Sequence, residues 1–556
     1  MRNLDAIGAG FNRLGSRGAS AALSIVAIFL SIALAPVARE QPASYQDLLA
    51  LFKEWRTFQS PRLIQGVPDY SVAAMAAQHK ALASFTRRLE AIDPARWPIP
   101  QQVDWHIVRA EMNGLDFDHR VLRPWANNPA FYVTVFPSRS DQPAREGHNA
   151  LGAVEIWSYT FPLSTADAEQ MAVGVRAIPG LLEQAKKNLA GTGKDLWEFG
   201  TGSIRRQSND LERLASRVGT TAGSLPSDIA RAKQSTDAFA AWLGSEVRSK
   251  NGRSGIGVQN YDWYLKNVQL VPYTWREVAT LMERELGRAH AFLALEEKRN
   301  AALPQQAPIA SAEEHASRFD RAISEYMAYL RDHDILTVKP WMEPALRAQT
   351  GRFNPGPREF FSEIDYRDPE IMRTHGYHWF DLARMTNEPH PSPIRRGPLL
   401  YNIFITKTEG HATGWEEMML QAGMFDARPR SRELIYILLA QRAARALGDL
   451  RMHANEWTLE EAAKNTSANT PRGWLRLEAN LVRSEQHLYL QQPAYGTSYL
   501  VGKIQIEQMM AARRRQLGDQ FTIRRFMDEF DAAGLIPASL VHWELTEEKP
   551  VVLDAR

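Results

Sequence analysis

The sequence has no cysteine among its 556 residues. This absence excludes disulfide bonds, a lipid-bearing cysteine, thiolate zinc sites, iron–sulfur ligation, c-type haem attachment and cysteine nucleophiles. It fits an oxidising compartment, where a free thiol is a liability. Any catalytic or metal site in this chain must therefore use nitrogen and oxygen groups.

Several common catalytic motifs are also absent. None of the fourteen histidines is followed by glutamate, so the zinc-peptidase motif HExxH does not occur. The segment GTGK at Gly191 lacks the upstream glycine of a phosphate-binding loop, and GIGVQN at Gly255 lacks the last glycine of a dinucleotide fingerprint. In GRSGIG at Gly252 the fifth position is Ile256, which excludes a serine nucleophile elbow. Nucleotide-binding proteins, serine hydrolases and standard zincins are thus unsupported.

The chain also has little excess charge of either sign. The net charge is +2, and Arg2, Arg13 and Arg17 against Asp5 account for all of it. The rest of the chain is neutral, and its one basic run, at 513–515, fits a single solvated helical turn. A nucleic-acid partner is therefore not expected.

The N-terminus has the pattern of an export signal. Basic residues precede an apolar stretch, Ala19–Ala35. Pro36 follows that stretch directly and should hinder cleavage there, so a cut after Ala38 and an uncleaved anchor are both open. We expect residues 1–38 to be a signal peptide or membrane anchor. The product should be periplasmic or secreted, held at the inner membrane if the leader is not cut.

Helix signals dominate the remainder. A hydroxyl residue three positions before a carboxylate recurs ahead of apolar-periodic stretches, which is typical of helix N-termini. The pairs are Thr274 with Glu277, Ser311 with Glu314, and Thr458 with Glu461. Alternating runs of strand type are scarce. We predict a mainly α protein with two helical lobes and a cleft: an N-terminal lobe over 39–252, and a C-terminal lobe over 253–556 that carries the chemistry.

The C-terminal half contains the only close histidine pair. His375 and His378 are three residues apart, so on a helix they would project about 60° apart from one face and could share a metal ion. A packed or capping pair is the alternative.

Two glutamates follow at helical spacing. Glu409 and Glu416 are seven residues apart and would lie on one helical face. A carboxylate inside such a helix can ligate zinc or act as an acid–base group. A solvated acidic face or a buried salt bridge explains the spacing equally well.

Arg445, Asp449 and His453 recur at every fourth position and form one polar stripe on a predicted helix. Asp449 could fix the tautomer and orientation of His453. An ordinary surface Arg–Asp pair is the alternative. The neighbouring residues are mostly Ala and Leu, which indicates that the stripe is at least partly buried.

Three motifs of this half occur in the same order in a known family. They are EGHATGWE (409–416), RALGDLRMH (445–453) followed by Trp457, and PAYGTSYLVG (493–502). On these motifs the chain resembles the bacterial domain-of-unknown-function 885 family, whose members look like distant helical zinc metallopeptidases of the gluzincin kind. His411 replaces a tryptophan of the family pattern, and Leu500 replaces a lysine.

The first motif of that family, HEaxPGHH, is represented here by HGYHWF. Gly376 stands where the family has its general-base glutamate, which deprotonates water in a zinc peptidase. The resemblance implies zinc, or no cofactor at all if the motif has decayed, with His375, His378 and Glu409 as the metal ligands. Glu416 is then the obvious replacement for the missing base.

The same resemblance implies further site residues. His453 and Tyr499 would donate hydrogen bonds to a developing oxyanion. Arg445 and Asp449 would contact the substrate. These roles require that the polar stripe and the histidine pair meet in a common pocket.

Three functions remain open on this evidence. The first is a divergent metallohydrolase acting on short peptides or small amides. The second is a non-catalytic envelope protein that binds a peptide or small molecule in the same cleft. The third is a helical carbohydrate-active enzyme that uses paired carboxylates. In each case contact with a membrane would be limited to the leader.

Overall fold

A computed structural model describes residues 44–144, 148–219 and 223–554. The predicted signal peptide or anchor, residues 1–38, lies outside these ranges. The described residues belong to one compact unit. None of their helices combines the length and the apolar character that a bilayer span requires.

Helices make up most of the described chain, which confirms the predicted mainly α fold. The strands within these ranges form two short pairs. They are β1 (Leu63–Ile64) with β2 (Val67–Pro68), antiparallel, and β3 (Val135–Phe136) with β4 (Val154–Glu155), parallel. Each strand has two residues, so the pairs fasten loops rather than form a layer of the fold.

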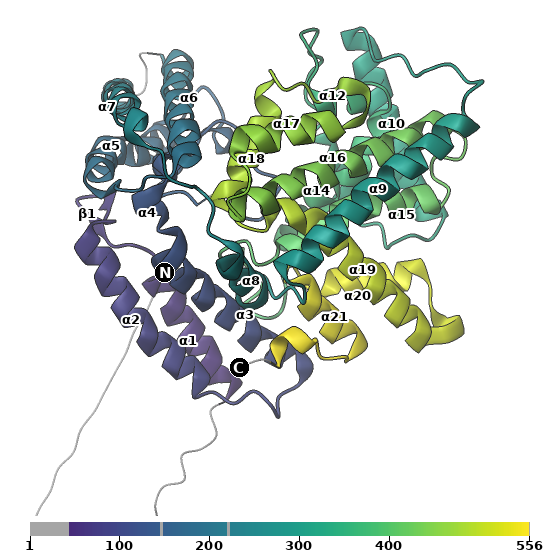
Figure 1. Cartoon of the computed structure of the whole chain (residues 1–556), viewed down its shortest axis with the longest axis horizontal. Coiled ribbons are helices and arrows are strands. Elements are labelled where there is room, and N and C mark those ends of the chain that lie inside the picture. Colours follow the sequence, from purple (N-terminus) through teal and green to yellow (C-terminus); the bar gives the residue numbers. More distant parts are fainter. Residues whose placement is uncertain (1–43, 145–147, 220–222, 555–556) are drawn as a thin grey trace, which may run out of the picture. The chain divides into compact units, whose positions relative to one another are not determined.

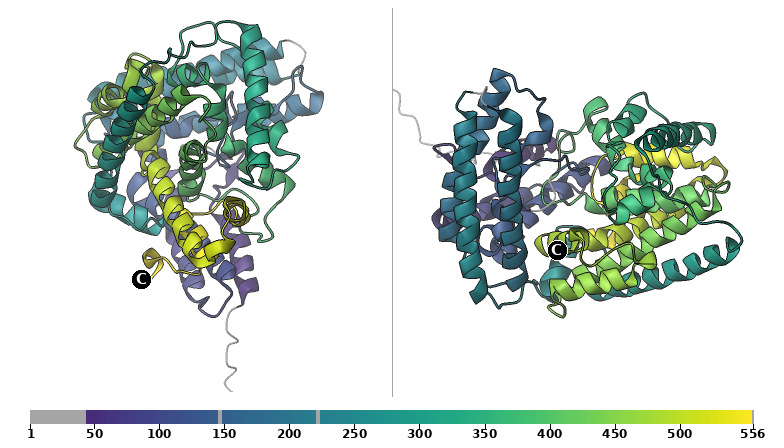
Figure 2. Two further views of the ribbon diagram at one scale, coloured as in Figure 1. Left: turned by 90° about the vertical axis from the view of Figure 1, so that its right-hand side faces the viewer. Right: turned by 90° about the horizontal axis from the view of Figure 1, so that it is seen from above.

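The N-terminal part has two groups of helices. The first group comprises α1 (Tyr45–Phe58), α2 (Val72–Glu90), α3 (Ile99–Phe117), the π-helix η1 (Asp118–Leu122) and α4 (Pro124–Asn127). The second comprises α5 (Thr165–Asn188), α6 (Lys194–Val218) and α7 (Leu225–Glu246). Both views show α5, α6 and α7 side by side (Figures 1 and 2).

The remaining helices fill the C-terminal part. They are α8 (Val258–Asn267), α9 (Trp275–Arg299), α10 (Ala312–Asp332), α11 (Met342–Arg347), α12 (Phe360–Asp365), α13 (Pro369–His375), α14 (Tyr377–Asn387), α15 (Ile405–Gln421), α16 (Pro429–His453), α17 (Leu459–Asn469), α18 (Asn480–Gln491), α19 (Tyr495–Leu517), α20 (Ile523–Ala532) and α21 (Ala538–Thr546). Among them α15 and α16 are buried along almost their whole length.

The helix starts predicted from hydroxyl–carboxylate pairs are present. α9 and α17 begin with complete capping boxes, in which the Thr side chain and the Glu side chain each bind the other residue's backbone N–H. At α10 the box is incomplete. Ser311 accepts from the backbone of Glu314, but the Glu314 carboxylate accepts from Ala310 instead of from Ser311. The local pattern therefore fixed where these helices begin.

Two hydrophobic clusters account for most of the core. One consists of residues between Tyr70 and Val247 and holds α5, α6 and α7 together. The other joins α1 and α3 to the C-terminal helices, so residues before and after position 252 share it. The predicted lobe boundary at 252 stays a prediction.

Candidate metal centre

The contact between α15 and α19 brings two of the sequence motifs together. A Cβ on Gly410 would lie 2.4 Å from the Cα of Gly502, and a Cβ on Gly502 would lie 1.9 Å from the carbonyl oxygen of Thr406. Only glycine permits this approach, because any side chain would overlap the backbone of the other helix. The contact sets Glu409, the neighbour of Gly410, beside Tyr495 at the start of α19.

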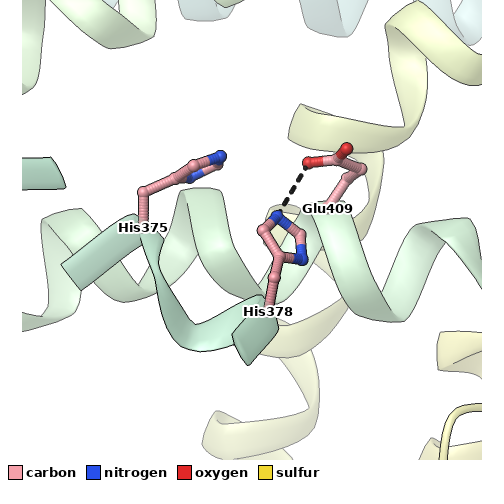
Figure 3. A group of neighbouring side chains, drawn as sticks. All are labelled: His375, His378 and Glu409. Carbon is pink, nitrogen blue, oxygen red and sulfur yellow. Dashed lines mark ion pairs between the residues drawn. The ribbon is translucent and has the colours of Figure 1, made fainter. Parts of the chain in front are cut away.

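The histidine pair lies at a break between two helices, and not on one continuous helix. α13 ends at His375 and α14 begins at Tyr377, with Gly376 between them. The two imidazole rings are 5.0 Å apart and nearly perpendicular, at 85°. The break turns both rings toward Glu409 on α15 (Figure 3).

His375, His378 and Glu409 offer one potential ligand atom each, and these atoms all lie within 4.8 Å of one another. Within the described ranges, no other group of three or more His, Asp or Glu residues has such a geometry. Two nitrogens and one carboxylate oxygen form the donor set of many catalytic zinc sites. The sequence prediction that these three residues share one place thus agrees with the geometry.

The two oxygens of Glu409 have different surroundings. Oε1 accepts hydrogen bonds from Gln142 at 2.9 Å and from the Tyr495 hydroxyl at 3.0 Å. Oε2 lies 3.3 Å from Nε2 of His378. Among the described residues, Oε2 and that Nε2 are buried and have no partner beyond this mutual ion pair. Burying an ion pair with no further hydrogen bonds is costly, and a cation bound between the two atoms would interact with both.

Gln142 and Tyr495 are site residues that the sequence analysis missed. Gln142 is held in turn by the Thr408 hydroxyl, which donates to its Oε1 at 2.7 Å. Gln142 comes from a loop more than two hundred residues away in sequence, so no spacing pattern marks it. Tyr495 lies inside the PAYGTSYLVG motif, four residues before Tyr499, the tyrosine to which the family resemblance gives a role.

The electrostatics favour charge separation between His378 and Glu409. Burial disfavours the imidazolium, but the carboxylates of Asp141 and Glu409 outweigh it and raise the pKa of His378 to about 9. Burial likewise opposes ionisation of Glu409, yet the charge of His378 lowers the pKa of Glu409 to about 2. Without a metal the two form a buried ion pair, and a cation binding there would displace the proton of His378.

Glu416 lies at the same site but is fully engaged. Both its oxygens accept from the Arg442 guanidinium, at 2.6 and 2.7 Å. Nδ1 of His375 is 3.0 Å from Glu416 and 3.1 Å from Arg442. Burial alone would raise the pKa of Glu416, but Arg442 and His375 lower it. Glu416 therefore orients His375, as carboxylates commonly do for histidine ligands.

The polar stripe of α16 extends beyond this cluster. Arg445 lies over the Tyr499 ring at 4.0 Å and pairs with Glu485. Its charge also helps to lower the pKa of Glu409, after the larger effects of burial and of the two histidines. Arg445 and Tyr499 thus belong to the surroundings of Glu409.

His453 and Asp449 lie further along α16 and are held by other partners. His453 is two turns beyond Arg445, about 12 Å along the helix axis, and its Nε2 donates to the Tyr489 carbonyl at 2.9 Å. The Asp449 carboxylate is 3.7 Å away and accepts from the Tyr261 hydroxyl and the Thr497 backbone. The tautomer of His453 is therefore set by a backbone carbonyl, and not by Asp449 as the stripe suggested.

A cavity of about 280 Å³ opens beside the two histidines. His375 and His378 line it together with Asp141, Arg373 and Trp379. Glu409 is not among its lining residues, which leaves it behind the imidazoles. A small molecule in this cavity would meet the histidines first.

The fold and the site define a mainly α protein with a two-histidine, one-glutamate cluster. The family model for a bacterial protein of unknown function (DUF885) matches residues 376–545. This match, over the part of the chain that holds the motifs, supports the family assignment made from them.

Solved structures support the fold. A predicted lipoprotein of unknown function from Shewanella oneidensis is 14% identical, with a TM-score of 0.66, and the match covers 91% of this chain and 100% of that one. A second predicted lipoprotein, from Colwellia psychrerythraea, is 16% identical, with a TM-score of 0.62 and coverage of 90% and 97%. At these identities the likeness concerns the fold alone. A comparison with curated proteins finds none that matches.

Proposed function

We propose that this protein is a metal-dependent hydrolase of short peptides or small amides. The observation that carries the proposal is the convergence of His375, His378 and Glu409 within 4.8 Å. It is supported by the burial of Nε2 of His378 and Oε2 of Glu409, which have no partner among the described residues beyond their mutual ion pair at 3.3 Å. The second oxygen of Glu409 is already occupied by Gln142 and Tyr495, so one oxygen remains for a cation.

A divalent cation held by these three residues would supply Lewis acidity, which activates water and polarises a carbonyl group. The chain supplies the positioning. Arg442 and Glu416 fix the Nδ1 side of His375. Hydrogen bonds from Gln142 and Tyr495 hold the Glu409 carboxylate in a single orientation. Such supporting contacts keep ligands in place before a metal arrives.

The acid–base group is assigned to Asp141. Gly376 has no side chain to accept a proton, and Glu416 is neutralised by Arg442. Asp141 lines the cavity beside both histidines, and after burial its charge has the largest effect on the pKa of His378. A carboxylate at that position can accept a proton from water and return it to a leaving amine.

Arg373 indicates the kind of substrate that fits. It lines the same cavity, and its Nη1 is buried without a hydrogen-bond partner among the described residues. Its Nη2 reaches Asp365 only at 3.3 Å. Beyond its ion pair with Asp365, Arg373 keeps one donor, Nη1, without a partner among the described residues. A guanidinium donor matches a carboxylate, so we assign the site to substrates that end in a carboxylate, such as short peptides.

A non-catalytic binding role is the second candidate. It is favoured by the loss of the glutamate at Gly376 and by the Arg442–Glu416 pair, which together remove the base of the ordinary zinc-peptidase mechanism. The hypothesis of a carbohydrate-active enzyme has no such support, because Glu416 is buried, is paired with Arg442 and does not face an open groove.

We place the protein in the cell envelope. The predicted leader directs export, and the two similar solved structures are described as predicted lipoproteins. This chain has no cysteine to carry a lipid, so the leader would be cleaved or would itself be the anchor.

Metal content and a peptide-cleavage screen together test the proposal. The hydrolase role requires about one zinc-like ion per chain, lost in His375→Ala and Glu409→Ala, and cleavage of some short peptide by the loaded protein. Metal-free protein of unchanged stability would favour the binding role instead.

A further inference from the structure

A second cavity, of about 420 Å³, lies away from the metal cluster, and none of the three ligand residues lines it. Its lining residues come from the π-helix η1, from the start of α4, from the short 3-10 helix Pro129–Tyr132 and from residues 148–153 ahead of β4, among others. Its walls include Tyr70, Asp118, Trp125, Phe131 and Tyr401. A cavity of this volume is within the range of small-molecule sites in proteins.

Aromatic rings form much of the wall. The rings of Tyr70 and Phe131 meet edge to face, with centroids 4.9 Å apart. Trp125 is nearly buried, and its ring lies 5.0 Å from that of His119. Aromatic faces carry partial negative charge and attract organic cations.

Asp118 puts a carboxylate into this aromatic wall. It is 7% exposed, and Nε2 of His148 lies 3.5 Å from its Oδ1, longer than a charge-assisted hydrogen bond. No hydrogen bond to its carboxylate exists within the described part of the chain. Burial raises the pKa of Asp118 to about 6, with His148 acting in the opposite direction. The described residues that line the cavity include no Lys or Arg.

The backbone around Asp118 is unusual. Asp118 opens the π-helix, and Arg123, which closes it, has φ of +43°. Tyr401 on the opposite wall has φ of +55°. Its ring fits only because position 114 is glycine, since a Cβ there would lie 2.3 Å from the Tyr401 ring. π-helical turns and left-handed non-glycine residues cluster at functional sites.

We propose that this cavity binds a small organic ammonium ion, with the Asp118 carboxylate as its counter-ion and the Trp125 and Phe131 rings as its walls. Charge complementarity sets the sign of the ligand, because a buried carboxylate without a full partner favours a cation. The aromatic wall sets its class, since an ammonium ion that carries carbon substituents gains from both the rings and the charge. The site is independent of the metal cluster.

The test uses the purified full chain and isothermal titration with choline and with benzylamine. The uncharged isostere 3,3-dimethylbutan-1-ol serves as a control for shape. We expect saturable binding of at least one cation, and binding of the isostere weaker by about tenfold or more.

Two variants locate the binding. Asp118→Asn keeps the shape of the side chain and should weaken the affinity for the cation by about tenfold. Asp116→Asn removes a carboxylate two residues away, where it pairs with Arg120, and should change the affinity by less than about twofold. Trp125→Leu should weaken the affinity for choline as well. This second variant keeps the test valid if Asp118→Asn does not fold.

The proposal is overturned if neither cation binds at concentrations up to about 10 mM. A Kd weaker than that would be too weak for a specific small-molecule site. It is equally overturned if the isostere binds as tightly as choline, or if the Asp118 and Trp125 variants both bind like the parent protein. None of these outcomes depends on metal loading or on hydrolysis.

Discussion

Gly410 of α15 lies directly against Gly502 of α19, so that a Cβ on Gly410 would be 2.4 Å from the Cα of Gly502. This contact joins the EGHATGWE and PAYGTSYLVG motifs. It explains physically why each motif contains its glycine. It also sets Glu409, next to Gly410, beside Tyr495, which lies about two helical turns before Gly502 on α19.

Gly410→Ala should therefore destabilise the protein by about 2 kcal/mol or more, since an added methyl in a packed contact forces backbone shifts. Gly287 of α9 is a matched control, because it is helical, exposed and has open space around its Cα. Gly287→Ala should stabilise by up to about 1 kcal/mol. Chemical denaturation measures both. Equal effects of the two substitutions would contradict the close crossing.

Asp449 should make stability depend on pH. Burial raises its pKa to about 8, whereas backbone and Tyr261 hydrogen bonds act against it. The folded state thus holds a proton that the unfolded chain has lost above about pH 4. The contribution of this group to the free energy of unfolding is fully present below that pH and is lost as the pH rises toward 8.

In Asp449→Asn this loss disappears. The stability of the variant relative to the parent should rise by about 1 kcal/mol per pH unit between about pH 5 and 8. Denaturation at several pH values measures this difference. Asp519→Asn, at an exposed position, should show a difference that stays constant with pH. A constant difference for Asp449→Asn as well would show that its carboxyl group is ionised in the folded protein.

The roles of Asp141 and Glu416 can be separated by substitution. Asp141→Asn should lower kcat by about a hundredfold or more, the contribution typical of a general base, with metal content unchanged. Glu416→Gln should weaken metal binding by about 10–100-fold, as expected for a group that orients a ligand. If instead Glu416→Gln abolished turnover at full metal content and Asp141→Asn remained active, Glu416 would be the base that the sequence suggested.

Arg373 should determine the preference for a substrate carboxylate. Arg373→Met should raise KM for peptides with a free C-terminus by about tenfold or more while leaving kcat nearly unchanged. Peptides with an amidated C-terminus should be cleaved equally by both proteins. A matched loss on free and amidated peptides would show that Arg373 supports the cavity wall and does not bind the carboxylate.

Much of the site could be predicted from the sequence because its motifs lie on helices. Glu409 and Glu416 are on one helix, as their spacing indicated, and both point toward the histidine pair. The spacing of His375 and His378 indicated a shared metal. It did not reveal the break at Gly376, because a glycine at a helix end is recognised only when its hydrogen-bond partners are known.

Other parts of the site depend on tertiary contacts that no local pattern contains. Gln142 and Asp141 reach the histidines from a distant loop. Arg442 neutralises Glu416, although it lies just outside the motif that begins at Arg445. His453 matched the motif but faces Tyr489, because eight residues of helix separate it from Arg445. A regular spacing predicts which residues share one face of a helix, but it does not predict which neighbouring element each turn of that face contacts.

Metal analysis of the purified, zinc-reconstituted and dialysed protein decides whether His375, His378 and Glu409 hold a metal ion. The geometry predicts about one equivalent of zinc per chain, with an unfolding temperature that rises on loading. His375→Ala, His378→Ala and Glu409→Gln should each lose the ion, whereas His290→Ala, at an exposed position, should keep it. A parent protein that retains no zinc and shows no thermal shift would mean that His378 and Glu409 are a buried ion pair and nothing more.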